Sequence, residues 1–201
     1  MIIDNQFDTV YHEHLSFFNT KSMKVCANMS GFSLVDVRKV SIHGGSYVFV
    51  LRSGTHDESL SNEQVIKEEQ SGVYNIELYH KYATNCKKVV SDFVKQVENF
   101  KQEGYKVVGY GAAAKGNTFL NFANIDLDYI IDDNPLKQGL YTPGMDILIK
   151  GCHSLKTEDH SKIVIVPLAW NFFNEIKKRA NETSGSNLTY IKYFPKLEVI
   201  S

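Results

Sequence analysis

The second half of the chain alternates between apolar runs and amphipathic segments, and this alternation constrains the fold more than any other feature. Four runs have the length and composition of buried strands: residues 105–110, 126–131, 163–168 and 189–194. Helical patterns follow the first and the third run, at residues 117–123 and 170–181. Strands that alternate with helices form parallel sheets with helices packed on their faces. We therefore predict a small Rossmann-like, three-layer α/β domain with a mainly parallel sheet over residues 105–201.

The first sixty residues predict a small α+β segment. A helix is expected from Asn19 or Thr20 to Met29, because an asparagine or threonine is a good N-cap and Gly31 follows the last helical residue. Two strand-like runs come next, at residues 32–37 and 40–52. The second is interrupted by the sequence His-Gly-Gly-Ser at 43–46, where a bulge or a close backbone approach is expected.

A long helical connection is predicted over residues 61–104. Its apolar residues recur at spacings of three and four, and Ser61 with Gln64 has the pattern of a capping box. Gly72 divides the pattern into two helices, and Gly104 is expected to end the second as a left-handed cap.

Charge and composition exclude several classes of function. The 201 residues carry 22 Lys and Arg against 23 Asp and Glu, so nothing indicates binding to nucleic acid or to an anionic membrane surface. No apolar stretch approaches the length of a membrane span, and no basic-then-apolar leader opens the chain. The three cysteines are far apart and odd in number, which fits reduced thiols. We predict a cytoplasmic protein with no nucleic-acid or membrane partner.

Four consecutive proton-handling residues stand near the start of the chain: Tyr11, His12, Glu13 and His14. In an extended segment Tyr11 and Glu13 share one face and the two histidines share the other, whereas a bend brings Tyr11, Glu13 and His14 together. The run thus offers a base, an acid and a hydroxyl at one place, although a solvated loop remains the alternative interpretation. No metal site is predicted, because neighbouring residues rarely hold one ion without a distant further ligand.

A glycine-rich turn occupies residues 109–118, where a strand passes into a helix. Small residues let backbone amides approach a phosphate, the helix amino end adds partial positive charge, and Lys115 adds a full one. The spacing also matches Gly-x-Gly-x-x-Ala with Asp132 about twenty residues later, so an NAD site stays open. The phosphate loop of nucleoside triphosphatases is excluded, because Lys115 precedes Gly116. A tight turn that needs small side chains is the alternative.

Five segments, taken together and in order, resemble the sugar C-methyltransferases, which act on nucleotide-linked keto-sugars with S-adenosylmethionine. They are Phe7-Asp8-Thr9-Val10-Tyr11-His12-Glu13-His14, the His-Gly-Gly-Ser stretch at 43–46, and residues 109–118, 133–139 and 169–172. The resemblance extends over nearly the whole chain. It implies the end of the family's catalytic domain followed by all of its C-terminal domain.

The resemblance also implies roles for individual residues. His14 is the expected general base beside the sugar ketone, Glu13 orients or shares the proton, and Tyr11 hydrogen-bonds the sugar or its enolate, while His12 is left as structural. The remaining expected contacts to the acceptor sugar, the nucleotide or its diphosphate are His43, Ser46, Gly111, Lys115, Asn117, Thr118, Trp170 and Asn171.

The chain departs from the family pattern in two ways. The zinc module and the methyl-donor domain of family members are not found in these residues, and Tyr47 and Val48 stand where the family commonly has leucine and arginine. We therefore expect the acceptor-binding, proton-abstracting part of a C-methyltransferase, with S-adenosylmethionine bound by a separate subunit. The alternatives are a noncatalytic remnant or partner-docking module that self-associates, and an NAD-dependent oxidoreductase using Gly109, Gly111 and Asp132.

Overall fold

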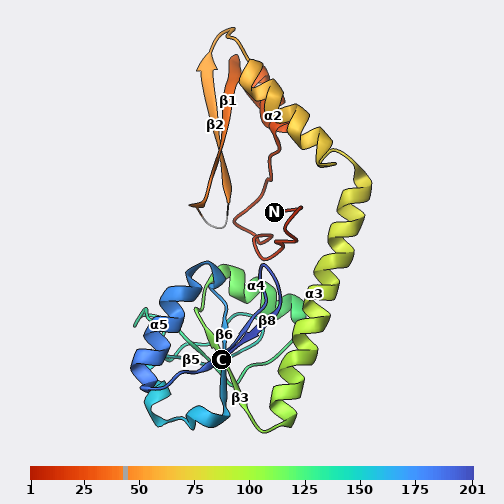
Figure 1. Cartoon of the computed structure of the whole chain (residues 1–201). Helices are drawn as coiled ribbons and strands as arrows, with labels where there is room; N and C mark the ends of the chain where they lie inside the picture. The colour runs from red at the N-terminus through yellow and green to blue at the C-terminus, as the bar shows by residue number, and fades with distance from the viewer. Residues whose placement is uncertain (43–44) are drawn as a thin grey trace. The chain divides into compact units, whose positions relative to one another are not determined.

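The computed structural model describes residues 1–42 and 45–201, which form two compact units (Figure 1). The first unit holds residues 1–3 and 13–83, and the second holds residues 4–12 and 84–201. His43, one of the expected site residues, lies outside the described residues. Among those described, no helix has both the length and the apolar character needed to cross a membrane.

The first unit contains two helices and a β-hairpin: α1 (Thr20–Met29), β1 (Phe32–Val40), β2 (Ser46–Ser53) and α2 (Ser59–Gln70). Asn19 caps α1 as predicted. Its side chain accepts from the Ser22 amide at 2.9 Å, and the Ser22 hydroxyl oxygen accepts from the Asn19 amide at 3.0 Å. The capping box predicted at Ser61 is wrong, because α2 already begins at Ser59 and the Ser61 hydroxyl donates to the Glu58 carbonyl.

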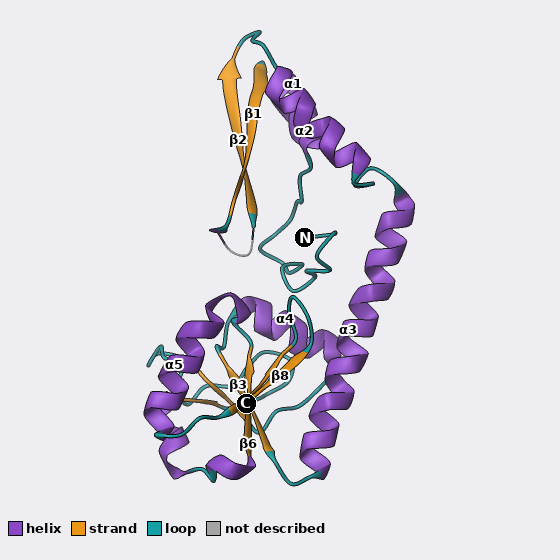
Figure 2. Ribbon diagram, in the orientation of Figure 1, coloured by secondary structure: helices purple, strands orange, loops and turns teal. Residues whose placement is uncertain are grey.

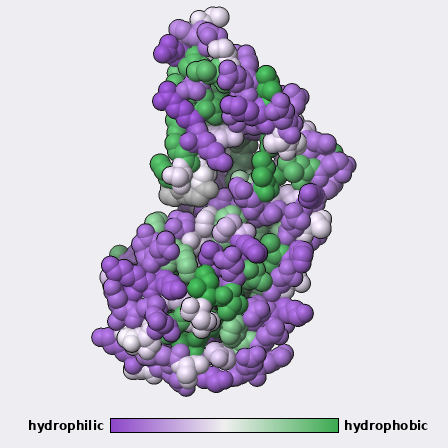
Figure 3. All heavy atoms as spheres, in the orientation of Figure 1, coloured by the Kyte–Doolittle hydropathy of each residue, from purple (hydrophilic) through white to green (hydrophobic). Residues whose placement is uncertain are grey.

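The hairpin strands pair antiparallel from Phe32 opposite Ser53 to Val40 opposite Ser46. One face lies toward α2, since the Tyr47 hydroxyl accepts from the Gln64 amide group at 2.9 Å. The neighbouring residue, Val48, points to the opposite face and is 45% exposed. Apolar atoms accordingly show along this hairpin in the space-filling view (Figure 3).

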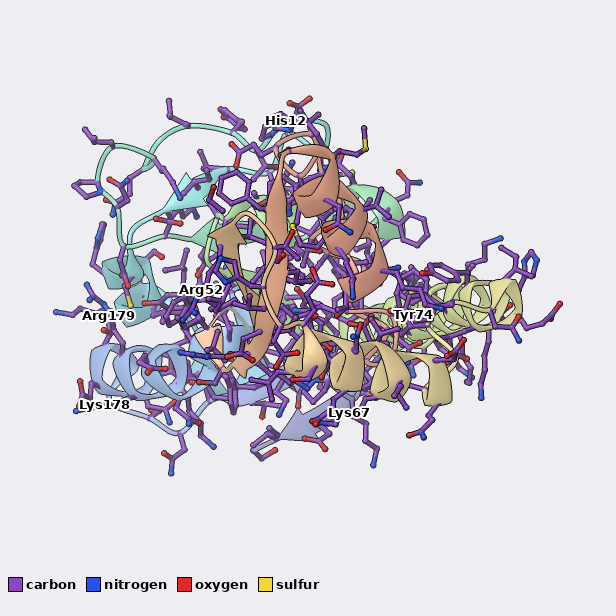
Figure 4. All side chains as sticks on the ribbon, turned by 90° about the horizontal axis from the view of Figure 1, so that it is seen from above. His12, Arg52, Lys67, Tyr74, Lys178 and Arg179 are labelled. Carbon is purple, nitrogen blue, oxygen red and sulfur yellow. The ribbon has the colours of Figure 1, made fainter. Side chains whose placement is uncertain are left out.

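A buried carboxylate joins the two helices of the first unit. Glu68, in the last turn of α2, is only 4% exposed and accepts from both the amide and the hydroxyl of Thr20, at 3.0 and 2.7 Å. The hydroxyl of Tyr74, which is labelled in Figure 4, donates to the same carboxylate. Burial and the proximity of Glu68 raise the pKa of Tyr74. Glu68 therefore ties the start of α1 to the end of α2.

Replacing Glu68 with alanine is expected to lower the free energy of unfolding by about 3 kcal/mol, because three donors lose a charged acceptor. The adjacent Glu69 provides the matched control. Its carboxylate is exposed and only meets Lys21 at 3.4 Å, so Glu69→Ala should cost about 0.5 kcal/mol or less. Urea unfolding followed by circular dichroism measures both values. Equal costs for the two variants would contradict the structural role of Glu68.

The helix α3 (Ile76–Gln102) begins in the first unit and enters the second at Thr84. Gly72, with φ of +80°, separates it from α2, and Gly104, with φ of +81°, follows its last turn. Both glycines thus act as the sequence predicted.

The second unit contains a six-stranded sheet of order β5-β4-β3-β6-β7-β8. Its strands are β3 (Lys106–Tyr110), β4 (Tyr129–Ile131), β5 (Ile149–Lys150), β6 (Ile163–Pro167), β7 (Thr189–Lys192) and β8 (Glu198–Ile200). All neighbours pair parallel except β7 and β8. The four strands expected from the sequence are confirmed. The strands β5 and β8 were not predicted, because with two and three residues they give too short a periodic signal.

Helices cover both faces of this sheet (Figure 2). On one face lie α3 and α4 (Ala114–Ala123), which bury Phe93 and Phe119 against the strands. On the other lies α5 (Phe173–Ser184), which buries Ile176 and Ala180. The Phe119 ring stacks on Tyr193 with centroids 3.8 Å apart. The predicted three-layer α/β architecture is confirmed.

Candidate functional site

The carboxyl ends of the central strands bring three loops to one edge of the sheet. Tyr110 at the end of β3 is level with Ile131 of β4 and with Pro167 of β6. The loops that follow are therefore neighbours, and ligands of open parallel sheets bind at this edge. They carry the glycine-rich turn, Asp132 and Trp170.

The glycines of the turn are required by packing. A Cβ on Gly111, which has φ of +99°, would lie 2.9 Å from the Ala169 Cβ, and a Cβ on Gly116 would lie 2.7 Å from the Leu168 Cβ. Both distances are too short for real atoms, so the turn after β3 is pressed against the loop after β6. The structure thus agrees with the tight-turn interpretation of this motif.

Replacing Gly111 with alanine is expected to lower the free energy of unfolding by about 3 kcal/mol, from left-handed backbone strain plus overpacking. Gly104→Ala is the matched control, because that glycine also has positive φ but has no neighbouring atom within 4 Å of the position that a Cβ would take. Its expected cost is the strain alone, about 1–2 kcal/mol. Thermal unfolding of both variants measures the difference, and identical costs would contradict the close approach at Gly111.

Asp132 has a structural role at the end of β4. Its Oδ2 accepts from the Ala112 amide at 2.8 Å and pairs with Lys137 at 3.2 Å, while its Oδ1 accepts from the Asn134 amide at 2.9 Å. Both oxygens are therefore used within the protein, on a side chain that is 9% exposed. The NAD hypothesis needs this carboxylate for a ribose hydroxyl, whereas here both of its oxygens already accept hydrogen bonds from the protein.

Lys115 and Trp170, both predicted site residues, lie close together at this edge. The Lys115 ammonium is 5.1 Å from the centroid of the Trp170 ring. The indole Nε1 of Trp170 donates to the Oδ2 of Asp8 at 2.6 Å. Asp8 was not among the predicted site residues, although it stands three positions before Tyr11 in the same motif.

Burial raises the pKa of Asp8 above 3.8, opposed by the Trp170 hydrogen bond and the Lys115 charge. The carboxylate is 3% exposed, and its Oδ1 has no hydrogen-bond partner within the described ranges 1–42 and 45–201. The ring system of Trp170 also contacts Phe194, with centroids 4.2 Å apart. This side chain therefore connects the N-terminal segment to the loop after β6.

The N-terminal segment at residues 4–12 is held on the second unit at two further points. The Phe7 ring lies 5.8 Å from Phe119 and 5.1 Å from Phe122, both on α4. The Cys86 thiol on α3 donates to the Asn5 carbonyl at 3.7 Å. The segment consequently belongs to the core of the unit that carries the glycine-rich turn.

The boundary between the units falls inside the proton-handling motif. Tyr11 and the exposed His12, labelled in Figure 4, belong to the second unit, with ring centroids 6.2 Å apart. Glu13 and His14 belong to the first unit, where the His14 ring lies edge-on to Phe17 at 6.1 Å. The structure brings Tyr11 into one unit with Lys115, and it does not bring Glu13 and His14 into that unit.

The remaining predicted site residues have local partners. The Thr118 hydroxyl donates to the Ala114 carbonyl at 3.0 Å, and the Asn117 side-chain oxygen accepts from Asn121 at 3.2 Å. Asn171 is exposed after β6. Ser46 opens β2 in the first unit and donates to the Ile42 carbonyl at 3.0 Å.

Asp133 marks a polar hollow of about 490 Å3 toward the β5 side of the sheet, which the sequence analysis did not find. Its carboxylate accepts from the Tyr110 hydroxyl at 3.1 Å. It also pairs at 3.0 Å with Arg179 of α5, a residue that is labelled in Figure 4. Cys152 and His153 also line this hollow. The signal in the sequence was the position of Asp133, two residues after a predicted strand.

The profile of the C-methyltransferase C-terminal domain matches residues 41–195. The chain belongs to this C-methyltransferase family. C-methyltransferase NovU of Streptomyces niveus is similar over the whole chain, with 28% identity across 207 residues that make up 49% of NovU. The chain thus spans about half the length of this relative, and the family resemblance seen in the sequence is confirmed.

S-adenosylmethionine is the methyl donor that membership in the C-methyltransferases implies. The glycine-rich turn does not fit it. Gly111 and Gly116 are packed against the loop after β6, and both carboxylate oxygens of Asp132, which follows the next strand, accept hydrogen bonds from backbone amides. The residues described, 1–42 and 45–201, also contain no group of three or more His, Cys, Asp or Glu able to hold a metal ion.

Proposed function

We propose that this chain is the acceptor-binding part of an S-adenosylmethionine-dependent C-methyltransferase that acts on a nucleotide-linked keto-sugar. The hydrogen bond between Asp8 and Trp170 is the observation that carries this proposal. It joins the segment leading into the proton-handling motif to the ligand edge of the sheet. A substrate that carries both a charged diphosphate and a ketone would bind the ligand edge through its diphosphate and the proton-handling motif through its ketone.

The proposed chemistry begins with proton removal. Methylation of carbon needs a carbon nucleophile, which a sugar provides once a proton beside its ketone is removed. His14 takes this proton, Glu13 orients the imidazole, and Tyr11 donates to the enolate oxygen. A positioned base contributes a factor of roughly 10²–10⁴, and a donor to the enolate oxygen contributes a comparable one.

The nucleotide end of the substrate is assigned to the start of α4. The N-cap residue of this helix is Ala113, whose side chain cannot accept a hydrogen bond, so no capping side chain occupies the first backbone amides. Together with Lys115 they form a suitable partner for a diphosphate. Further contacts to the nucleotide are proposed for Gly111, Asn117, Thr118, Trp170 and Asn171, and contacts to the sugar for His43 and Ser46.

The methyl donor is proposed to be held by a separate domain or subunit. The turn after β3 does not fit S-adenosylmethionine, and NovU has about as many residues again beyond the matched half. In this proposal the chain binds and deprotonates the acceptor. The methyl group is supplied from outside it.

Calorimetric titration tests the assignment of acceptor and donor. The chain is expected to bind dTDP- or UDP-linked keto-sugars and to give no heat with S-adenosylmethionine. The opposite result, tight binding of S-adenosylmethionine without a response to the sugars, would overturn the proposal. Both ligands are titrated into the same protein preparation, so an inactive preparation is recognised because it gives no heat of binding with either ligand.

A docking role is the second candidate, favoured by apolar side chains on the first unit. Val25 and Met29 of α1 are 58% and 84% exposed, and Leu60 and Ile66 of α2 are 54% and 53% exposed. Such residues are typical of surfaces that meet another protein. Size-exclusion chromatography with light scattering is expected to show self-association under this hypothesis, and a monomer at all concentrations would contradict it.

A further inference from the structure

Asp8 is an unusual carboxylate for a residue that only supports the fold. Glu68, the structural carboxylate of the first unit, accepts from three donors. Asp8 is equally buried, yet Trp170 is the hydrogen-bond donor found for its Oδ2, and its Oδ1 has none among the residues that the structure describes. A buried carboxylate with one unpaired oxygen costs stability. Its presence therefore calls for a reason other than stability.

The position of Asp8 suggests that reason. Asp8 stands three positions before Tyr11, which limits the distance between their Cα atoms to at most about 11 Å. The chain also turns between them, because the Val10 amide donates to the Phe7 carbonyl at 2.9 Å and the Tyr11 amide donates to the Thr9 carbonyl at 3.1 Å. The hydrogen bond that fixes the position of Asp8 therefore also restricts the position of Tyr11.

The other end of the contact lies at the nucleotide side of the proposed site. Trp170 begins the short helix after β6, and its ring is within 5.1 Å of the Lys115 ammonium. The positive charge of Lys115 also acts on the Asp8 carboxylate, in the direction that lowers its pKa. One hydrogen bond across 162 residues of sequence therefore links the segment of Tyr11 to the start of α4.

We propose that Asp8 is a positioning residue: through the Trp170 indole it sets the separation between the group that meets the sugar, Tyr11, and the group that meets the diphosphate, Lys115. This inference rests on the proposed function. The affinity for a ligand that has only the nucleotide does not depend on the separation between Tyr11 and Lys115. The affinity for a ligand that has both the nucleotide and the sugar does depend on it.

Two variants separate this role from a structural one. Asp8→Leu removes the acceptor and leaves the Trp170 indole N–H without its partner, so a loss of stability of about 1–3 kcal/mol is expected. Asp8→Asn keeps an acceptor for the indole and serves as the conservative rescue. Glu68→Gln in the first unit is the control for altering a buried carboxyl elsewhere.

The ligands are dTDP and a dTDP-linked keto-sugar, titrated by calorimetry into the full chain. Asp8→Leu is expected to weaken binding of the linked sugar roughly tenfold and to leave dTDP unchanged, as expected for loss of one charged hydrogen bond. Asp8→Asn should recover most of the affinity. Trp170→Phe removes the indole donor, and combining it with Asp8→Leu should add no further loss, because both changes break the same contact.

A spectroscopic readout comes from Trp170, the one tryptophan of the chain. Its fluorescence is expected to titrate with Asp8, with a midpoint above 3.8 because burial raises the pKa of that carboxyl. Lys115 and Tyr193 are the other ionisable groups that interact with Asp8, and burial raises the pKa of Tyr193 well above its usual value. The transition should be present in Glu68→Gln and absent in Asp8→Leu.

The outcomes distinguish this inference from the proposed function. A parent chain that binds neither ligand overturns the proposed function, and the inference with it. A parent chain that binds both ligands equally, or an Asp8→Leu variant that keeps the affinity for the linked sugar or weakens both ligands alike, overturns the inference and leaves the proposed function standing. If Asp8→Leu loses affinity for the linked sugar only, and Asp8→Asn recovers it, the result supports both the inference and the proposed function.

Discussion

Replacing His14 with asparagine is expected to slow exchange of the sugar proton beside the ketone by roughly 10²–10⁴ in D2O. The imidazole is the proposed base, and asparagine keeps a polar side chain that cannot accept the proton at neutral pH. Loss of the proton signal of a dTDP-linked keto-sugar, followed by NMR, measures the rate. The assay needs no methyl donor, so the chain alone is sufficient.

His12→Asn is the matched control for this experiment. His12 carries the same imidazole two residues earlier, is exposed, and has no part in the proposed chemistry. Its exchange rate should equal that of the parent chain. Equal slowing in both variants would point to a general effect on the segment, and unchanged exchange in His14→Asn would remove His14 as the base.

Replacing Phe119 with alanine is expected to lower the free energy of unfolding of the second unit by about 3–5 kcal/mol. Phe119 is fully buried on α4 and packs against Tyr193, Phe93 and Phe7, at centroid distances of 3.8, 4.9 and 5.8 Å. Its removal leaves a cavity under three aromatic rings. Urea unfolding followed by the fluorescence of Trp170, which lies in the same unit, measures the loss.

Phe172→Ala is the control for this core substitution. The Phe172 side chain is 53% exposed in the short helix after β6, so its truncation should cost about 0.5 kcal/mol or less. A Phe119→Ala variant as stable as Phe172→Ala would contradict the assigned packing of α4 on the sheet.

The elements that have a strong local signal in the sequence were predicted correctly. The runs that became β3, β4, β6 and β7 are apolar over several residues, and Gly72 and Gly104 mark where helices end. The weaker signals failed. Ser61 has the spacing of a cap, but α2 begins two residues earlier, at Ser59, whose amide donates to the Asp57 carboxylate at 3.0 Å.

Motif patterns were less reliable for the site than for the fold. The spacing of Gly111, Gly116 and Asp132 matches that of a cofactor loop, yet the glycines are needed for packing and the carboxylate for hydrogen bonds to the turn. A spacing pattern records which residues are small or acidic. It does not record what lies opposite them after folding.

The order of the amino acids was enough to establish the α/β class, the parallel character of the sheet and the membership in the C-methyltransferases, because periodicity and motif order are properties of the chain read in one direction. The folded structure was needed to show that Asp8 meets Trp170, that Gly111 meets Ala169 and that Asp132 binds the turn after β3. These contacts join residues far apart in the sequence. They exist because parallel strands place their carboxyl ends at one edge, where loops without any local relation to one another become neighbours.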